Sequence, residues 1–202
     1  ICGKTRILKV LDRPTPYHVP HSTDIAGYAA VYSGDDRLYN NIFIGSDTKE
    51  NVGTAEYNGY TTSLEEYIEV ANETPGDIEI YKEAKQPAYI NKNAYFNGAT
   101  CFDKEGENLV HPQFNPNVEI IEDGDEVYLY CELPDNFDEV QGNVQTTATL
   151  GRVRIVDADF ENPDGSEIAV DMDLLGELRS ETSPLGPITS LQKGKNHIRI
   201  WS

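Results

Sequence analysis

The chain has 202 residues, 38% of them hydrophobic, and a formal net charge of −19 from 35 acidic and 16 basic residues. It contains no cluster of Lys and Arg that could neutralise phosphates, and no apolar run approaches the roughly 20 residues needed to cross a bilayer. The composition therefore argues against nucleic acid and a membrane as partners, and the length allows one large domain or two small ones.

The first segment, from Ile1 to Leu11, is apolar and β-prone, and we expect it to be a half-buried strand. A proline-rich loop follows. Pro14, Pro16 and Pro20 fix their own φ angles and push the preceding residues toward extended conformations. The segment from Arg13 to His21 is thus predicted to be stiff and non-helical.

Polar side chains are concentrated on this stiff loop, which makes it the candidate ligand site. A backbone fixed in advance holds hydrogen-bonding groups in place, as recognition of a polar ligand requires. The plainer alternative is that the histidines only cap neighbouring carbonyl groups. The candidate binding residues are Arg13, Tyr17, His18, His21 and Ser22, and the candidate catalytic carboxylate is Asp24.

Two short strands are predicted after the loop, from Gly27 to Tyr32 and from Leu38 to Ile44, with a turn from Ser33 to Asp36 between them. Strict alternation in the second strand places Asn40 on the same face as Ile42. In stacked β-solenoids an inward asparagine at a corner can bond the backbone of a neighbouring rung. We therefore interpret the run NNIFIG as a rung of such a stack.

One helix is predicted, at residues 63–76. Ser63 is a suitable N-cap with Glu66 three residues later, and apolar residues then recur with helical spacing until Pro75. Glu65, Glu66 and Glu69 should form its solvated face. We expect this helix to pack against the fold without taking part in chemistry.

The remainder of the chain, from Ile78 to Ser202, is predicted to contain only strands and turns, with an antiparallel region that caps the end of the stack. Turns are expected at Asn97-Gly98, Asp123-Gly124, Asp164-Gly165 and Lys193-Gly194. The predicted strands are Ile78 to Tyr81, Ala88 to Ile90, Ala94 to Phe96, Val118 to Ile121, Glu126 to Leu133, Thr146 to Leu150, Arg152 to Val156, Ile168 to Asp171 and Asn196 to Trp201. We therefore predict three parts of the chain: rungs with the site-forming loop at 1–62, a helical excursion at 63–76, and final rungs with a β-rich cap at 77–202.

Metal and cofactor chemistry has little support in the sequence. Cys2, Cys101 and Cys131 are an odd number without CxxC spacing, so we expect reduced core thiols rather than a zinc site or a disulfide framework. The acidic stretch from Asp157 to Asp173 lacks the EF-hand pattern, and a turn at Pro163 to Gly165 explains it better than calcium. No metal and no cofactor are therefore predicted.

Four runs of the sequence carry a family resemblance: RPTPYHVPHSTDIAG, DDRLYNNIFIG, LGRVRIVDADFENPDGSEIAVDMDLLGELRS and GPITSLQKGKNHIRIW. In this order they resemble the C-terminal half of bacterial right-handed parallel β-helix proteins similar to the β-xylosidases of glycoside hydrolase family 120. The resemblance implies a mainly β chain made of C-terminal β-helix rungs, one short helix and an antiparallel β cap. It also implies a retaining glycosidase that acts on xylo-oligosaccharides or related plant glycans.

The same resemblance implies that the two catalytic carboxylates lie on rungs before Ile1. This chain would then supply one wall of the sugar pocket, and its partners would be the oligosaccharide and an upstream β-helix portion or companion chain, with a homo-oligomer also open. Because a stack cut at Ile1 would expose strand edges, we expect the chain to be unstable as a lone monomer. The resemblance assigns Arg13, Tyr17, His18 and His21 to this wall, and it places Asp24 where a carboxylate is expected in the same segment.

Two other interpretations stay open. The chain could be a non-catalytic carbohydrate-binding β-helix module, or a polysaccharide lyase, which would need a basic residue and usually calcium at the cleft. Arg13 is the one support for a lyase. The first residues show no signal pattern, so the bacterial cytoplasm is slightly favoured, with the periplasm or secretion open if a signal precedes Ile1.

Overall fold

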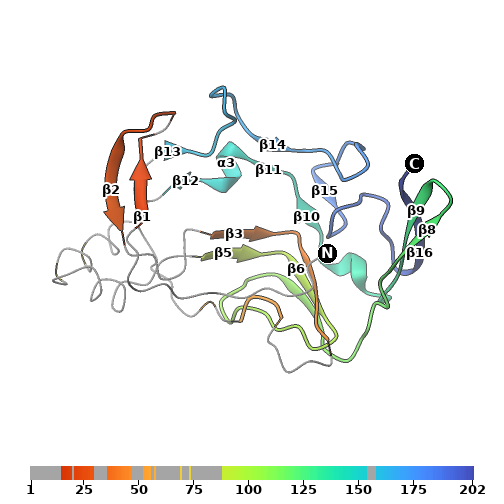
Figure 1. Cartoon of the computed structure of the whole chain (residues 1–202). Helices are drawn as coiled ribbons and strands as arrows, with labels where there is room; N and C mark the ends of the chain where they lie inside the picture. The colour runs from red at the N-terminus through yellow and green to blue at the C-terminus, as the bar shows by residue number, and fades with distance from the viewer. Residues whose placement is uncertain are drawn as a thin grey trace.

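The computed structural model describes residues 15–19, 21–29, 36–46, 52–55, 57, 69, 73, 88–153 and 158–202. Within these residues the elements are mostly strands arranged in several small sheets, so the mainly β prediction is confirmed (Figure 1). No helix in this part of the chain is long and apolar enough to cross a membrane. The predicted strands Ile1 to Leu11 and Ile78 to Tyr81 lie outside the described residues, as does most of the predicted helix. Of that helix, Glu69 and Glu73 are described, with helical backbone and exposed side chains.

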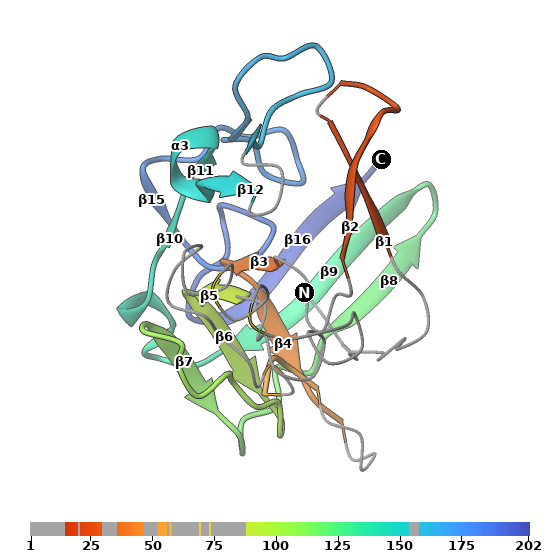
Figure 2. The same ribbon diagram turned by 90° about the vertical axis from the view of Figure 1, so that its left-hand side faces the viewer.

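The centre of the described fold is a stack of parallel strands, which we call the parallel stack (Figures 1 and 2). Its strands are β3 (Asp36–Tyr39), β4 (Ile42–Ile44), β5 (Ala88–Asn91), β6 (Asn93–Phe96) and β7 (Asn108–His111). β3 pairs with β5, and β4 pairs with β6, which in turn pairs with β7. A parallel bridge between Gly53 and Thr100 adds a third place at which successive passes of the chain lie on one another.

Two asparagines shape the corners of the parallel stack. The predicted strand from Leu38 to Ile44 is broken at Asn40, whose φ of 61° turns the chain between β3 and β4. The fully buried Asn93 donates from Nδ2 to the carbonyl oxygen of Leu38, and its Oδ1 accepts from the backbone N–H of Asn41. An asparagine therefore bonds the neighbouring pass as expected, but the residue is Asn93, because the corner at Asn40 interrupts strict alternation.

Alternating side chains give the parallel stack two buried faces. Phe43 and Tyr95 lie opposite each other in register and stack with ring centroids 5.1 Å apart. On the other face Phe96 is fully buried and belongs to one apolar cluster with Leu129 and Cys131 of the antiparallel sheet. Large rings are therefore buried on both faces of this stack.

The antiparallel sheet consists of β8 (Glu119–Asp123), β9 (Glu126–Leu133) and β16 (Gly194–Trp201), in the order β16-β9-β8. All three strands were predicted, and Leu129 and Cys131 of β9 are buried as its alternation requires. The thiol of Cys131 is free. The antiparallel sheet packs on a face of the parallel stack. The prediction from the sequence was that it would cover the end of the stack. Packing one sheet face on another buries both apolar faces.

The chain from residue 142 to residue 191 forms a third region, the upper layer, which lies above β3 and β5 in Figure 1. Its strands have only two residues each. The predicted strand from Thr146 to Leu150 is wrong, because Thr147–Leu150 is the short helix α3, capped by reciprocal bonds between Thr146 and Thr149. The elements are β10 (Gly142–Asn143), β11 (Gln145–Thr146), α3, β12 (Arg152–Val153), β13 (Ala158–Asp159), β14 (Ala169–Val170) and β15 (Thr182–Ser183), preceded by the 3-10 helix η1 (Phe137–Glu139).

The proline-rich segment is part of a β-hairpin rather than a free loop. β1 (Thr15–His18) pairs with β2 (Ile25–Ala29) in antiparallel fashion, with an irregularity between Tyr17 and His18. The predicted extended, non-helical backbone is confirmed for these residues, while Arg13 lies outside the described part. The predicted turn from Ser33 to Asp36 is described only at Asp36, where β3 begins.

Candidate functional site

The turn between β1 and β2 presents most of the predicted site residues to solvent. The side chains of His18, His21, Ser22 and Asp24 are exposed, whereas Arg13 and the side chain of Tyr17 lie outside the described residues. The turn surrounds an open depression lined by His18, Val19, His21, Ser22 and Thr23. The structure therefore brings four of the six predicted residues together on one exposed turn.

Local hydrogen bonds occupy two of these residues. His18 places Nδ1 3.1 Å from the carbonyl oxygen of Thr23, as the plainer capping alternative predicts. Ser22 accepts a 2.9 Å bond from the backbone N–H of Asp24. Within the described residues the carboxylate of Asp24 has no hydrogen-bond partner, so it is accessible to a ligand.

A distant residue that the sequence did not single out holds His21. The Nε2 atom of His21 lies 2.9 Å from Oε1 of Glu161, which follows β13 in the upper layer. A carboxylate at this distance orients the imidazole ring. The only signal for Glu161 in the sequence is the acidic run around it, because the two residues are 140 positions apart.

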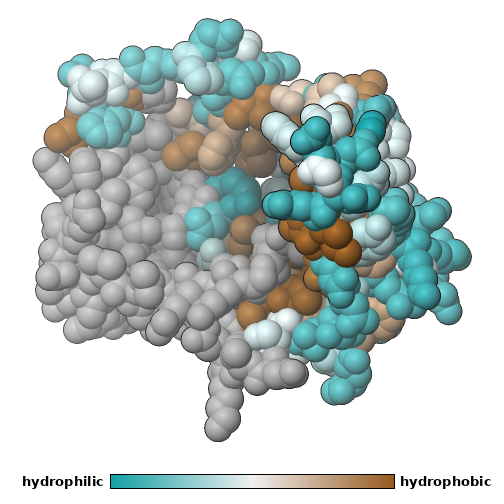
Figure 3. All heavy atoms as spheres, turned by 45° about the vertical axis from the view of Figure 1, so that its right-hand side comes forward, coloured by the Kyte–Doolittle hydropathy of each residue, from teal (hydrophilic) through white to brown (hydrophobic). Residues whose placement is uncertain are grey.

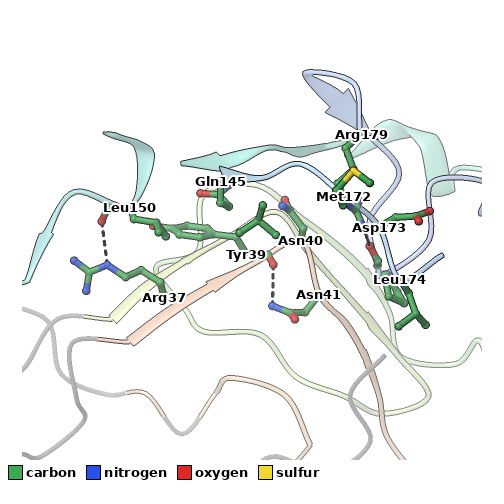
Figure 4. Close-up of a pocket in the computed structure, with 13 residues that line it drawn as sticks. Arg37, Tyr39, Asn40, Asn41, Gln145, Leu150, Met172, Asp173, Leu174 and Arg179 are labelled. Atoms are coloured by element: carbon green, nitrogen blue, oxygen red, sulfur yellow. Dashed lines mark hydrogen bonds between the residues drawn. The ribbon is translucent and has the colours of Figure 1, made fainter. Parts of the chain in front are cut away.

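A second cavity lies between β3 and the upper layer (Figure 4). Its volume is ≈ 570 Å³, within the range of small-molecule sites. Sequence reasoning missed it because its walls come from segments more than 100 residues apart. The lining residues are Arg37, Tyr39, Asn40, Asn41, Gln145, Leu150, Val170, Met172, Asp173, Leu174, Arg179, Gly186 and Pro187.

Arg37 braces one end of this cavity. Its Nε donates to the carbonyl oxygen of Leu150 and its Nη2 to that of Arg152, each at 3.0 Å. The guanidinium carbon also lies 4.3 Å and 4.5 Å from the ring centroids of Tyr89 and Phe160. These contacts fix the guanidinium between two rings and tie β3 to the upper layer.

Asp173 organises the turns at the other end of the cavity. Its Oδ1 accepts from the backbone N–H groups of Leu175 and Glu177, and its Oδ2 accepts from the N–H and the hydroxyl of Thr189. Burial raises the pKa of this carboxyl, but the four hydrogen bonds together outweigh burial and hold the pKa below its ordinary value. Since every bond is made within the protein, Asp173 is a structural carboxylate rather than an acid or base.

A second buried carboxylate, Glu105, lies inside the parallel stack. Its Oε1 accepts from the backbone and side-chain N–H groups of Asn93, and its Oε2 accepts from the hydroxyl of Tyr95 at 2.7 Å. Burial raises the pKa of Glu105, and the hydrogen bonds oppose that shift without cancelling it. Glu105 is 8% exposed, so it serves the core and not a ligand.

The described residues contain no group of three or more His, Cys, Asp or Glu side chains that could hold a metal ion. The turn predicted at Pro163 to Gly165 is present, with the N–H of Gly165 bonded to the carbonyl oxygen of Asn162. Asp164 accepts from the N–H and the hydroxyl of Ser166, and these bonds lower the pKa of Asp164. The acidic hairpin is thus held by its own turn.

Comparison with known proteins gives one informative relationship. No family model and no curated protein matches the chain. A solved structure does match: XylC in complex with xylose aligns along 100% of this chain with 57% sequence identity and a TM-score of 0.89. The chain is related to XylC. It covers 32% of XylC, so it spans about a third of the length of that protein.

Proposed function

We propose that the chain is the C-terminal part of a glycoside hydrolase that resembles the β-xylosidases and acts on xylo-oligosaccharides or related plant glycans. The observation that carries the proposal is the 57% identity, along the whole chain, to XylC, whose structure contains xylose. The parallel pairings of β3 with β5 and of β4 with β6 and β7 support the finer proposal that the stack is part of a right-handed parallel β-helix.

In this proposal the β1–β2 turn is one wall of the sugar pocket. An imidazole, a hydroxyl and a carboxylate offer both donors and acceptors, which suits the hydroxyl groups of a pyranose. His21, oriented by Glu161, and the accessible Asp24 are the groups that we expect to contact the sugar. Arg13 and Tyr17 remain proposed members of the same wall.

A retaining glycosidase needs two carboxylates roughly 5 Å apart. We propose that an upstream portion, or a companion chain equivalent to the rest of XylC, supplies the catalytic carboxylates and completes the pocket. Native mass spectrometry tests this arrangement. A species that contains this chain together with a larger partner supports it, and a lone monomer in both native and denaturing conditions overturns it.

Hydrolysis of an aryl β-xyloside by the native sample tests the activity. We expect Asp24→Asn to reduce turnover about 10- to 100-fold, because it removes a charged group that contacts the sugar, and the matched variant Asp135→Asn, at an exposed carboxylate, to leave turnover unchanged. Sugar binding without turnover would favour the alternative, a non-catalytic carbohydrate-binding module. Absence of both xyloside turnover and xylose binding would contradict either function.

A further inference from the structure

The cavity between β3 and the upper layer has one apolar wall. Val170, Met172 and Leu174 line it, and they keep 53%, 51% and 64% of their surface exposed. Apolar side chains reach the surface among hydrophilic ones in the space-filling view (Figure 3). Large apolar side chains left exposed beside a cavity are suited to the apolar face of a ligand.

Arg179 faces the same cavity with most of its hydrogen-bonding capacity unused. Its Nη2 donates to the carbonyl oxygen of Gly186 at 2.9 Å, and its backbone N–H bonds to the carbonyl oxygen of Asp171. Within the described residues its Nε and Nη1 atoms have no hydrogen-bond partner. The side chain is half-buried and is held in place at one nitrogen, so its guanidinium is oriented before any ligand arrives.

The charges that line the cavity favour an anionic ligand. The guanidinium of Arg37 is held by carbonyl groups and aromatic rings, which leaves Arg179 as the cation that faces the cavity, in a chain whose net charge is −19; the one carboxylate that lines the cavity is that of Asp173. Asp173 is fully engaged by four backbone and hydroxyl donors, so it does not neutralise Arg179 through a direct bond. A guanidinium with free donors matches a carboxylate in geometry and charge.

Asn41 is also among the residues that line the cavity. Asn41 uses its backbone N–H and its Nδ2 in bonds to Asn93 and to the carbonyl oxygen of Tyr39, as Figure 4 shows for the latter. Its Oδ1 accepts no hydrogen bond from the described residues. The cavity therefore offers a positively charged donor, a neutral acceptor and an apolar wall.

We propose that this cavity is a second carbohydrate site that binds a uronic acid residue. The sugar carboxylate pairs with Arg179, a ring hydroxyl donates to Oδ1 of Asn41, and the apolar face of the pyranose lies against Met172 and Leu174. The class of ligand rests on the proposed function, because a hydrolase of plant glycans meets chains that carry acidic sugar branches. The site itself is separate from the β1–β2 turn.

Titration of the native sample, together with any larger partner that it contains, with D-glucuronate, D-glucose and acetate by calorimetry tests the proposal. We expect glucuronate to bind roughly tenfold or more tightly than glucose or acetate, and Arg179→Gln to remove that preference. The matched variant Arg199→Gln removes one positive charge from the antiparallel sheet and should change nothing. Equal affinities for glucuronate and glucose would overturn the proposal. Equal losses of glucuronate affinity in Arg179→Gln and Arg199→Gln would overturn it as well. Glucuronate and acetate of equal affinity would indicate a simple anion site instead.

A second pair of variants covers the case in which Arg179→Gln fails to fold. Leu174 is 64% exposed, so Leu174→Glu and Leu174→Gln should both fold. The new carboxylate at the cavity wall should weaken glucuronate binding several-fold relative to the glutamine variant. Equal affinities would contradict a sugar seated at Leu174. Xyloside turnover and xylose binding report on the β1–β2 turn. If the native sample shows neither but binds glucuronate, the proposed hydrolase is rejected and the uronate site is retained.

Discussion

The parallel stack and the upper layer are held together in different ways. In the stack, strands of three or four residues pair in register, and polar side chains such as Thr54 and Asn93 are completely buried. In the upper layer, strands of two residues are joined by single polar side chains that bond the backbone. Strand pairing with successive passes of the chain therefore holds the parallel stack together, whereas the upper layer depends on a few side-chain contacts.

A buried chain of hydrogen bonds runs through the stack. The N–H of Phe102 donates to Oγ1 of Thr54, which lies 2.8 Å from the hydroxyl of Tyr95, and that hydroxyl donates to Glu105. Burial is the main reason why the pKa of Tyr95 lies well above its ordinary value. Every polar group of this network has a hydrogen-bond partner, so the network specifies one packing.

The upper layer uses local contacts instead. The hydroxyl of Thr147 donates to the carbonyl oxygen of Phe160 at 2.6 Å and accepts from the N–H of Ile168 at 2.8 Å. Asn40 reaches up from the corner of the stack, with Nδ2 donating to the carbonyl oxygen of Asn143. Loss of one such side chain should loosen the layer and leave the stack intact.

The largest effect should follow a cavity in the stack. Phe96→Ala removes a fully buried ring, and we expect it to lower the free energy of unfolding by about 3–5 kcal/mol in urea denaturation. Val110→Ala, on the neighbouring strand at a side chain that is 40% exposed, is the control and should cost less than about 1 kcal/mol. Similar losses in the two variants would mean that the stack is not the stabilising core.

A smaller and local effect is expected in the upper layer. Asp173→Ala leaves three N–H groups and a hydroxyl without their acceptor, which should cost roughly 2–3 kcal/mol of local stability. Native-state hydrogen exchange should show faster exchange at Leu175, Glu177 and Thr189, with stack amides unchanged. Asp138→Ala, at an exposed carboxylate, is the control. Uniformly faster exchange through the stack would show that the two regions unfold together.

The two regions should respond to pH with opposite signs. The raised pKa of Glu105 contributes stability that is present below about pH 4.3, the ordinary value, and is lost as pH rises through the folded pKa. The lowered pKa of Asp173 contributes stability that is present above about pH 3.9 and is lost as pH falls through the folded pKa. In Glu105→Gln the free energy of unfolding should no longer fall as pH rises through the folded pKa of Glu105. In Asp173→Asn it should no longer fall as pH drops through the folded pKa of Asp173. Denaturation curves at a series of pH values measure both slopes. Slopes of the same sign would contradict the assignment.

The smallest effect is expected where the upper layer touches the β1–β2 turn. Glu161→Gln removes the partner of His21, but both side chains are partly exposed, at 29% and 46%. Thermal unfolding should therefore report a loss of no more than about 1 kcal/mol. A loss above roughly 2 kcal/mol would mean that this pair holds the hairpin in place rather than orienting the imidazole. Glu167→Gln, at the residue that pairs with Glu161 in an isolated antiparallel bridge, is the control.

Much of the stack and of the antiparallel sheet could be predicted from local patterns. The alternation in Glu126 to Leu133 gave the bounds of β9, and the glycines of the four predicted turns, Gly98, Gly124, Gly165 and Gly194, all have positive φ. The failures have local causes as well. Thr146 to Leu150 has β-prone residues, but the reciprocal Thr146 and Thr149 caps stabilise a helical turn there.

The candidate sites could be predicted only in part. His18, His21, Ser22 and Asp24 do share one turn, since they are close in sequence and the prolines keep the chain extended. Nothing in the sequence pairs His21 with Glu161, and nothing marks the cavity that Arg179 faces. Both depend on where the upper layer lies on β3.

Local sequence patterns are sufficient to predict the mainly β character, the strands of the antiparallel sheet and the exposed polar turn, because alternation, proline and glycine act on neighbouring residues. Packing between distant segments sets which asparagine bonds the neighbouring pass, which carboxylate orients His21, and where a cavity opens between β3 and residues 170–187. Those outcomes depend on contacts between segments 50 to 140 residues apart, which no local pattern encodes.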